Sequence, residues 1–328
     1  MAESESKFPP RRLGLSDVYV SPVAMGCWPI AGMTSLEVDD ASSRATLREA
    51  LRCGVTHFDT AYCYGAAGES ERLVGECLRD ARHAVTIATK GGIHWNEQGE
   101  RVQDARPATL KRQCDESLQR LGFDHVDLLY LHAPDPQVPI AESVGALAEL
   151  LAQGKTRSLG LSNVSVAQLE EARQVAPISA VQPHFNMLQR EIEDDLLPYC
   201  QQHSISAMVY WPLMKGLLAG KLPREHVFAP GDGRAKYPMF QGEEWQRNQD
   251  FVDELRALAK ELGRSVTEVV INWTIQRGGI TAALCGAKRD YQIRESALAM
   301  RWRLSQDQIA QIDRAIERRG PIATRAAV

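Results

Sequence analysis

Several patterns that define large protein classes are missing from this sequence. The seven cysteines are scattered, odd in number and lack paired CxxC spacing, and the eight histidines are dispersed as well. These features argue against a disulfide framework or a zinc site, so we expect no metal and reduced cysteines in a cytoplasmic protein. The segment 1–7 is polar and acidic, without the basic and apolar regions of a signal peptide.

Long apolar runs and an excess of positive charge are also absent. No apolar run is long enough to span a bilayer, and the net charge is −4, so we expect neither a membrane nor a nucleic acid as partner. The composition, with 44% hydrophobic and 24% charged residues, is that of an ordinary folded protein. A chain of 328 residues is compatible with one α/β barrel.

What the sequence does contain is a regular alternation of short apolar runs and helical patterns. The runs expected as strands cover residues 23–26, 56–59, 84–90, 126–132, 156–161, 178–182, 205–210 and 280–285. Eight strands alternating with helices predict a (β/α)8 TIM barrel of the α/β class. The rival is a doubly wound open sheet, but no GxGxxG follows the first strand.

The chain outside the alternating pattern divides into a few segments. We expect a flexible N-terminal tail over 1–10, a single domain over 11–320 and a C-terminal tail over 321–328. Residues 12–20 hold a turn between apolar and aromatic residues and predict a short β-hairpin before the barrel. The stretch 222–246 is rich in proline and glycine and predicts a long loop after the seventh strand, which is typical of a lid or binding loop.

Four polar residues stand at or just after the ends of three consecutive expected strands. Asp59, Lys90 and His132 end the second, third and fourth strands, and Tyr64 lies in the loop after Asp59. In a parallel barrel these ends meet at the catalytic face. Lys90 would pair with Asp59 and lower the pKa of Tyr64, while His132 would hydrogen-bond the substrate oxygen.

Each residue has an ordinary interpretation when it is taken alone. A strand-end aspartate is more often a cap, a lysine after a strand is more often solvated, and a histidine on an apolar strand is more often a core residue. Four such residues at the matching ends of consecutive strands favour a catalytic constellation instead.

Motifs distributed along the chain support this interpretation. They are Phe58-Asp-Thr-Ala-Tyr-Cys-Tyr64-Gly65, Ala88-Thr-Lys90-Gly91, Leu129-Tyr-Leu-His132, Gly160-Leu-Ser162-Asn163, Val181-Gln182 and Tyr210-Trp-Pro-Leu213. With them the sequence resembles the aldo-keto reductase superfamily over residues 11–315. The resemblance implies an NADP(H)-dependent carbonyl reductase on a (β/α)8 barrel, with Asp59, Tyr64, Lys90 and His132 as its acid–base tetrad.

The resemblance also implies a set of cofactor contacts. Ser162, Asn163 and Gln182 would bond the nicotinamide carboxamide, and Tyr210 would stack on its ring. The pyrophosphate contacts would be Leu213, Lys215, Gly216 and Leu218, and the contacts to the adenosine 2′-phosphate end would be Gly286, Lys288, Arg289, Gln292 and Glu295. Gln292 replaces an arginine that many members carry, which leaves the preference for NADP over NAD open, and Trp211 replaces a residue that is commonly small.

Other function classes remain to be compared with a reductase. Trp28 and Trp95 would line an aromatic pocket for a small carbonyl or sugar substrate, although ordinary core packing explains them equally well. The alternative function is an NADP(H)-binding, redox-sensing regulatory subunit with little turnover. A metal-dependent barrel hydrolase lacks its His/Asp ligand cluster. For the reductase we expect a monomer or a weak homo-oligomer.

Overall fold

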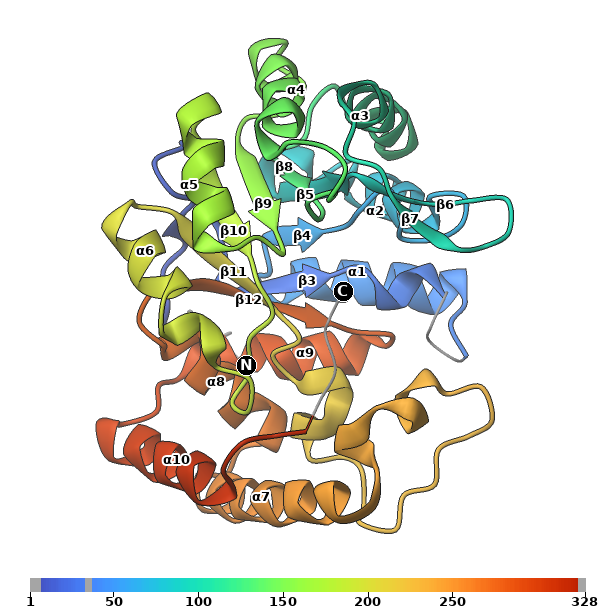
Figure 1. The fold of residues 1–328 in the computed structure, drawn as a ribbon. Coiled ribbons are helices and arrows are strands. Elements are labelled where there is room, and N and C mark those ends of the chain that lie inside the picture. The colour runs from blue at the N-terminus through green and yellow to red at the C-terminus, as the bar shows by residue number, and fades with distance from the viewer. Residues whose placement is uncertain (1–6, 33–36, 324–328) are drawn as a thin grey trace.

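The computed structural model describes residues 7–32 and 37–323, and its centre is a closed barrel of parallel strands (Figure 1). The barrel strands are β3 (Val23–Gly26), β4 (His57–Asp59), β5 (Thr86–Gly91), β8 (Leu128–Leu131), β9 (Leu159–Ser162), β10 (Ile178–Gln182), β11 (Ser206–Tyr210) and β12 (Ile280–Gly286). They follow one another around the barrel in chain order, and β12 pairs with β3 to close it. The predicted (β/α)8 barrel is therefore confirmed, with strand ends shifted by up to three residues.

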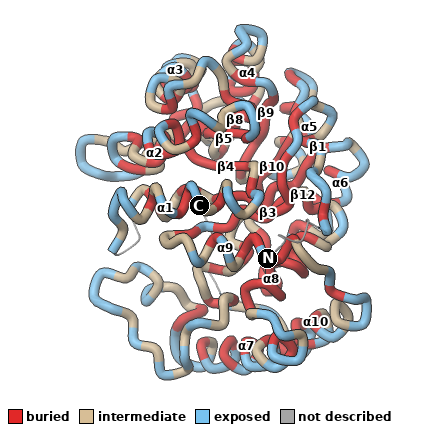
Figure 2. The backbone as a smooth tube through the Cα atoms, turned by 180° about the vertical axis from the view of Figure 1, so that it is seen from behind, coloured by how far each residue is buried: buried red, intermediate tan, exposed pale blue. Residues whose placement is uncertain are grey.

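Helices surround the barrel and cover its outer face (Figure 2). They are α1 (Asp40–Arg52), α2 (Glu69–Leu78), α3 (Pro107–Leu121), α4 (Ile140–Ala152), α5 (Val166–Val175), α6 (Leu196–Gln202), α7 (Gly242–Glu261), α8 (Val266–Gln276), α9 (Asp290–Leu298) and α10 (Gln306–Arg319). Short 3-10 turns are η1 (Pro29–Ala31), η2 (Arg82–Ala84), η3 (Glu191–Glu193), η4 (Met214–Ala219), η5 (Gly233–Lys236), η6 (Pro238–Phe240) and η7 (Ala299–Arg301). Apolar side chains between strands and helices form the larger part of the core.

Local signals explain where several helices begin and end. Helix α3 begins at Pro107, whose missing N–H costs nothing at a first helical position, and ends before Gly122, which has a φ of 67°. Capping boxes at Ser165, Ser265 and Ser305 start α5, α8 and α10. In each box the serine oxygen accepts from the backbone N–H three residues later, so a helix-terminal donor is satisfied.

The N-terminal hairpin closes one end of the barrel. Strands β1 (Arg11–Arg12) and β2 (Tyr19–Val20) pair antiparallel, as the sequence predicted. The apolar residues between and within these strands pack against the barrel interior. The hairpin bonds to the first residues of barrel strands: Gly14 N donates to Ser206 Oγ at 2.9 Å, and Thr86 Oγ1 donates to Tyr19 O at 2.8 Å. Because the hairpin fills the N-terminal end, the opposite end is the open face.

Five features differ from the sequence-based expectation. Helices α7 and α9 were not predicted, and residues 191–203, whose pattern predicts one helix, form η3 and α6 instead. The long loop after β11 ends at residue 241, because 242–246 belong to α7, which begins without a side-chain cap. The antiparallel hairpin of β6 (Ile93–Trp95) and β7 (Arg101–Gln103) was also missed, because three-residue strands carry too short a pattern.

Residues at the inner ends of the two expected tails contact the rest of the chain. Phe8 is only 2% exposed, with the guanidinium groups of Arg11 and Arg303 over its ring. Ala323 N bonds to Glu244 at 2.8 Å. Residues 1–6 and 324–328 lie outside the described residues.

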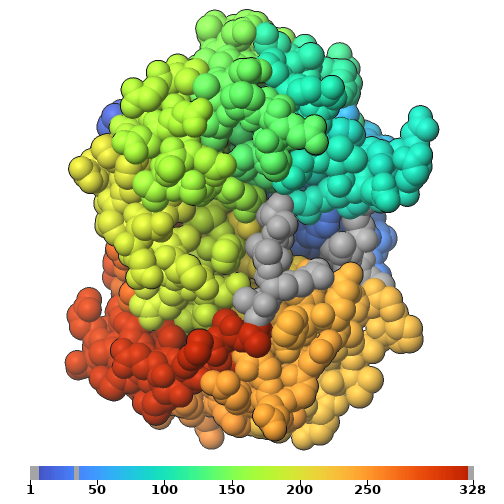
Figure 3. Space-filling view, viewed as in Figure 1, coloured from blue at the N-terminus to red at the C-terminus, as the bar shows by residue number. Residues whose placement is uncertain are grey.

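The segments after β11 form a distinct part of the surface. In Figure 3 the gold and orange segments, which include α7, lie beside the red C-terminal helix α10, and the teal hairpin β6–β7 projects from another side. Arg319 of α10 is buried and donates to Asn248 Oδ1 of α7 at 2.7 Å. Among the described residues, no helix is long and apolar enough to cross a membrane, and no three His, Cys, Asp or Glu residues are placed to hold a metal.

Candidate active site

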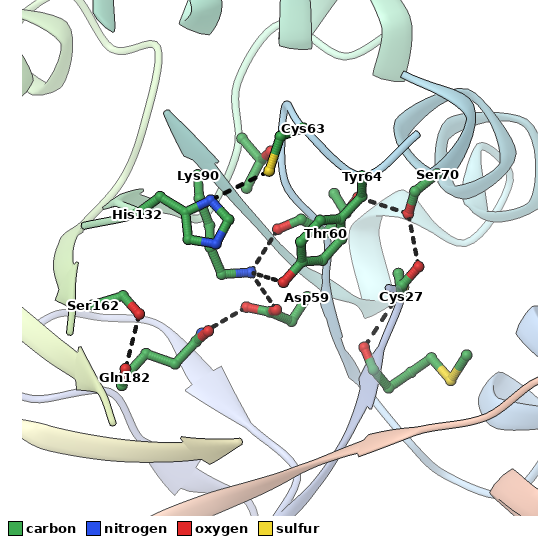
Figure 4. A network of polar contacts seen from close by, with 12 residues as sticks. Cys27, Asp59, Thr60, Cys63, Tyr64, Ser70, Lys90, His132, Ser162 and Gln182 are labelled. Carbon is green, nitrogen blue, oxygen red and sulfur yellow. Dashed lines mark hydrogen bonds and ion pairs between the residues drawn. The ribbon is translucent and has the colours of Figure 1, made fainter. Parts of the chain in front are cut away.

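Asp59 and Lys90 form a buried ion pair at the open end of the barrel (Figure 4). They come from neighbouring strands β4 and β5, and Lys90 Nζ lies 2.5 Å from Asp59 Oδ1. Lys90 Nζ also donates to Thr60 O at 2.8 Å and lies 3.3 Å from the Tyr64 hydroxyl. Both members are at least 98% buried, so neither charge could be kept without the other.

Tyr64 is held over this pair by the loop that follows β4. Lys90 Nζ lies 4.7 Å from the centroid of its ring, and its backbone N–H donates to Ala61 O at 3.0 Å. Burial first, and then the Asp59 carboxylate, raise the pKa of Tyr64 well above its usual value. The sequence argument expected Lys90 to lower this pKa; in the structure Asp59 offsets the lysine charge. The phenol therefore stays protonated at neutral pH and can act as a proton donor.

His132 lies directly after β8, and its ring edge faces Tyr64. The ring centroids are 5.9 Å apart, and His132 Nδ1 lies 3.6 Å from Cys63 Sγ. Burial, followed by the charges of Lys90 and Arg101, lowers the pKa of His132 well below its usual value. The ring is therefore neutral at pH 7, with one nitrogen able to donate and the other able to accept a hydrogen bond.

The residues expected at the nicotinamide lie directly beside the tetrad. Gln182 Nε2 donates to Asp59 Oδ2 at 2.8 Å, and Ser162 Oγ donates to the Gln182 carbonyl at 2.8 Å. Asn163 Nδ2 donates to His132 O at 3.0 Å, and the Tyr210 hydroxyl donates to Asn163 Oδ1 at 2.7 Å. The structure thus joins the ends of β4, β8, β9, β10 and β11 in one polar network.

The segment after β11 is the most strained part of the described backbone. Trp211, Met214 and Lys215 have φ angles of 60°, 45° and 55°, and Gly216 follows with 92°. Non-glycine residues in this region are costly and concentrate at ligand sites. The Lys215 ammonium lies 4.0 Å from the Trp211 ring centroid. Trp211, which stands where a small residue is common in the family, therefore has a specific contact. The sequence expected this segment to contact the pyrophosphate.

Two leucines from the same expected set pack toward the core. Leu218 is fully buried, and its N–H donates to Leu213 O at 3.2 Å. Leu213 is partly buried against the core.

The residues expected at the adenosine end gather at the start of α9. Gln292 Oε1 accepts from the backbone N–H groups of Lys288 at 2.8 Å and Arg289 at 3.1 Å, so it caps the helix rather than offering an oxygen to a ligand. Arg289 donates to Glu37 O at 2.7 Å. Glu295 accepts from Lys221 Nζ at 2.9 Å, and Gly286 approaches Pro29 so closely that a Cβ would lie 3.0 Å from the proline ring.

Both candidate substrate residues touch the loop that carries Tyr64. Trp28 packs edge-to-face on Tyr64, with the ring centroids 5.0 Å apart. Trp95 Nε1 donates to Cys63 O at 2.8 Å. Both tryptophans therefore lie beside the catalytic loop, and Trp95 also packs against the small apolar cluster of Ala61, Cys63, Ile93 and Ala133.

Sequence reasoning missed two arginines near the site. Arg120 of α3 donates to Tyr62 O at 3.1 Å, and Arg101 of β7 carries a charge that acts on His132 and Tyr64. Neither stands at the carboxyl end of a barrel strand, so no positional signal marked them. Both depend on segments distant in the chain from the tetrad motif.

The comparisons with known proteins agree with this geometry. The model of the aldo/keto reductase family matches residues 22–317. The chain belongs to the aldo/keto reductase family. Over 303 residues it is 34% identical to the aldo-keto reductase YhdN of Bacillus subtilis, covering 92% of this chain and 91% of that protein.

Two further relatives show the range of activities in such proteins. The NADH-specific methylglyoxal reductase of Escherichia coli is 32% identical, over 89% of this chain and 94% of that protein. The glycerol dehydrogenase AKR11B4 from Gluconobacter oxydans superposes with a TM-score of 0.89 at 33% identity, covering 97% of this chain and 98% of that one. The chain is therefore similar to oxidoreductases named for different substrates and cofactors.

Proposed function

We propose that this member of the family is an NADP(H)-dependent reductase that converts a small aldehyde, ketone or aldose to the alcohol, reversibly. The observation that carries the proposal is the buried Asp59–Lys90 pair with the Tyr64 hydroxyl 3.3 Å from the lysine nitrogen. A protonated phenol held beside a cation is the group that a developing alkoxide needs as its acid.

The residues divide the work of carbonyl reduction among them. The nicotinamide cofactor supplies the hydride when it is bound. Tyr64 gives its proton to the carbonyl oxygen as negative charge builds there. Lys90 stabilises the phenolate that remains, Asp59 holds Lys90 in place, and neutral His132 orients the oxygen by a hydrogen bond.

The described residues fit a nicotinamide cofactor. The amides of Asn163 and Gln182 and the Ser162 hydroxyl converge at the ends of β9 and β10 beside the tetrad, and Tyr210 contacts the same group. In the proposal they hold the carboxamide and ring, and the strained turn containing Lys215 holds the pyrophosphate. The choice of NADP(H) rests on Lys288 and Arg289 as phosphate ligands.

The decisive variant is Tyr64→Phe, which removes only the acidic hydroxyl. We expect carbonyl reduction to fall by roughly 10²–10⁴-fold, as is typical for a lost general acid, with little change in NADPH affinity. Wild type and variant are assayed on a panel of aldehydes, ketones and sugar alcohols with NADPH and with NADH. Near-normal reduction by a folded variant would refute the role of Tyr64, and tight NADPH binding without turnover by wild type would favour the regulatory alternative.

A further inference from the structure

The hairpin β6–β7 brings a cation to the rim of the proposed site. Trp95 and Arg101 are directly paired across this antiparallel hairpin, as are Ile93 and Gln103. Opposite residues of an antiparallel pair project from the same face, with Cβ atoms about 5 Å apart. The Arg101 side chain therefore leaves the hairpin on the same face as the Trp95 side chain.

That face is the one turned to the catalytic loop. Trp95 Nε1 bonds to Cys63 O, one residue before Tyr64, and Ile93 packs with Cys63 and Ala133, the neighbour of His132. Gln103, on the same face, lines an open cavity of about 540 Å³ that Ala133 and Asn163 also line. Arg101 thus lies on the hairpin face that is turned to the catalytic loop, two residues before Gln103 at the cavity.

The guanidinium of Arg101 is not engaged elsewhere. Within residues 7–32 and 37–323 it makes no hydrogen bond or ion pair, and the residue is exposed. The adjacent Glu100 accepts from Asn96 at 3.0 Å, and Asp104 pairs with Arg106 at 2.6 Å. The neighbouring carboxylates therefore have their own partners, and the Arg101 charge is available to a ligand.

The charge of Arg101 also acts on the side chains of the site. Burial raises the pKa of Tyr64 and Cys63, and the charge of Arg101 opposes this effect. Burial lowers the pKa of His132, and the charge of Arg101 adds to this effect. A single charge that acts on three side chains of the site is positioned to act on a substrate bound among them.

We infer that Arg101 is a specificity-determining residue that selects carbonyl substrates bearing an anionic oxyacid group, a carboxylate or a phosphate. The inference rests on the proposed carbonyl reduction at Tyr64. The planar guanidinium pairs with two oxygens of such a group at once, which fixes the orientation of the substrate as well as its affinity. The carbonyl end of the substrate then lies at Tyr64 and His132, and the anionic end at the rim.

The test compares aldehydes of the same carbon chain with and without an anionic group. Butanal is paired with succinic semialdehyde, and glyceraldehyde with glyceraldehyde 3-phosphate, and kcat/KM is measured for each with wild type and Arg101→Gln. We expect the wild type to prefer the anionic member of each pair, and Arg101→Gln to lose about 10- to 100-fold on anionic substrates, mainly through KM. Neutral substrates should change less than about 3-fold. The preference should also weaken as salt is added.

Two controls separate this inference from the proposed function. Arg12→Gln removes the same charge from the hairpin at the opposite end of the barrel and should leave the preference intact. Arg101→Lys keeps the positive charge but lacks the planar guanidinium that pairs with two oxygens, and it should retain part of the preference. Equal kcat/KM for charged and neutral substrates, or equal losses on both in Arg101→Gln, would overturn the inference while turnover of neutral aldehydes still upholds the reductase.

A binding measurement decides the inference even without turnover. Succinate has no carbonyl to reduce, and its binding to the NADPH complex can be followed by tryptophan fluorescence, since Trp95 is paired with Arg101. Binding that weakens at least 10-fold in Arg101→Gln supports the inference. Unchanged binding, or none with wild type, overturns it.

Discussion

At the residue scale, His57 is a buried titratable group that the proposed reaction does not use. It lies on β4 two residues before Asp59, is fully buried, and neither ring nitrogen has a hydrogen-bond partner among the described residues. Burial lowers the pKa of His57 to about 4, although the nearby carboxylates of Asp59 and Asp127 oppose this effect. The folded protein therefore holds this ring in its neutral form.

This neutral histidine should make the protein sensitive to mild acid. The unfolded chain protonates a histidine near pH ~6.5, above the folded value, so stability is full above that pH and is lost as pH falls toward 4. The variant His57→Leu removes the titration without breaking a hydrogen bond. Its free energy of unfolding should fall less steeply with decreasing pH, so that the loss at pH 4.5 is about 2 kcal/mol smaller than in the wild type.

The measurement is urea unfolding between pH 4.5 and 7.5. His132, whose pKa is lowered too, contributes in the same direction, so the slope should shrink rather than vanish. The exposed His83 provides the control, and His83→Asn should follow the wild type. Parallel pH curves for wild type and His57→Leu would contradict the assignment.

The choice between NADPH and NADH is also decided at the residue scale. Lys288 and Arg289 precede α9, where Arg289 also lies 3.9 Å from Asp39 Oδ2. Replacing both with alanine should weaken NADPH by about 1–3 kcal/mol, the loss of a charged contact, with little effect on NADH. Dissociation constants for both cofactors check this. Arg294→Gln on the same helix, whose arginine pairs with Glu49, is the control, and equal losses for NADPH and NADH would reject the assignment.

At the element scale, one ion pair joins α2, α3 and the loop that carries Tyr64. Arg120 of α3 lies 3.1 Å from Glu71 Oε2 of α2, donates to Tyr62 O and stacks 4.1 Å from the Tyr62 ring centroid. The other Glu71 oxygen accepts from Thr89 of β5 at 2.6 Å. Glu71 is fully buried, so it depends on Arg120 for its charge balance.

Two variants separate stability from positioning at this pair. Arg120→Met leaves the Glu71 charge buried and should cost roughly 3 kcal/mol in the free energy of unfolding, with a lower kcat because the Tyr64 loop is released. Adding Glu71→Gln removes the stranded charge, so stability should partly return while kcat stays low. Urea unfolding and steady-state kinetics test both variants. Recovery of kcat together with stability would show that Arg120 has no positioning role.

Sequence patterns predicted elements where the signal is local. The barrel strands are continuous apolar runs, and α3, α5, α8 and α10 carry a proline, glycine or capping box at an end. Helix α7 escaped prediction although Val252, Leu255 and Leu258 repeat at helical spacing, because a proline- and glycine-rich stretch precedes it and no side chain caps it. A strong local start signal therefore matters as much as periodicity.

The candidate site was predictable where its residues stand at the ends of the predicted strands. Asp59, Lys90 and His132 could be grouped because parallel strand ends must meet at one face. The bond from Gln182 to Asp59 spans 123 positions, and the position of Arg101 depends on a hairpin of two three-residue strands. Such contacts follow from how the elements pack, which no single segment encodes. The burial of Tyr64 and the Asp59 charge, which together raise the pKa of Tyr64, were missed for the same reason.

At the scale of the whole molecule, the two ends of the barrel have different roles. One end is filled by the β1–β2 hairpin, and the other carries the polar network, the strained turn after β11 and the β6–β7 hairpin. The long loop links these parts to the outer helices. Arg224 pairs with Asp250 of α7 at 2.7 Å, and Asn248 Nδ2 of α7 donates to Met239 O at 2.9 Å.

Between these anchors the loop approaches the expected phosphate site. Lys215 Nζ lies 4.8 Å from the Tyr237 ring centroid, and Arg234 pairs with Asp232 at 2.6 Å. The pKa of Asp232 is lowered, first by the bond from Arg234 and also by the charge of Lys288, so the loop brings its charged groups near the start of α9. Val227, in contrast, is 85% exposed and marks a part of the loop with little packing.

A loop that is anchored at its ends by ion pairs and hydrogen bonds, and that is exposed in its middle, is suited to close over a bound cofactor. If residues 214–241 hold the pyrophosphate, NADPH should slow amide hydrogen exchange there, because opening the loop would then require release of the ligand. Exchange in α10, far from the expected phosphates, serves as the internal control and should not change. NADH, which has the same pyrophosphate, should protect the turn at 214–219 at equal saturation, whereas protection near Asp232 should depend on the 2′-phosphate. Exchange that is unchanged across 214–241 at saturating NADPH would show that this loop is not a cofactor clasp.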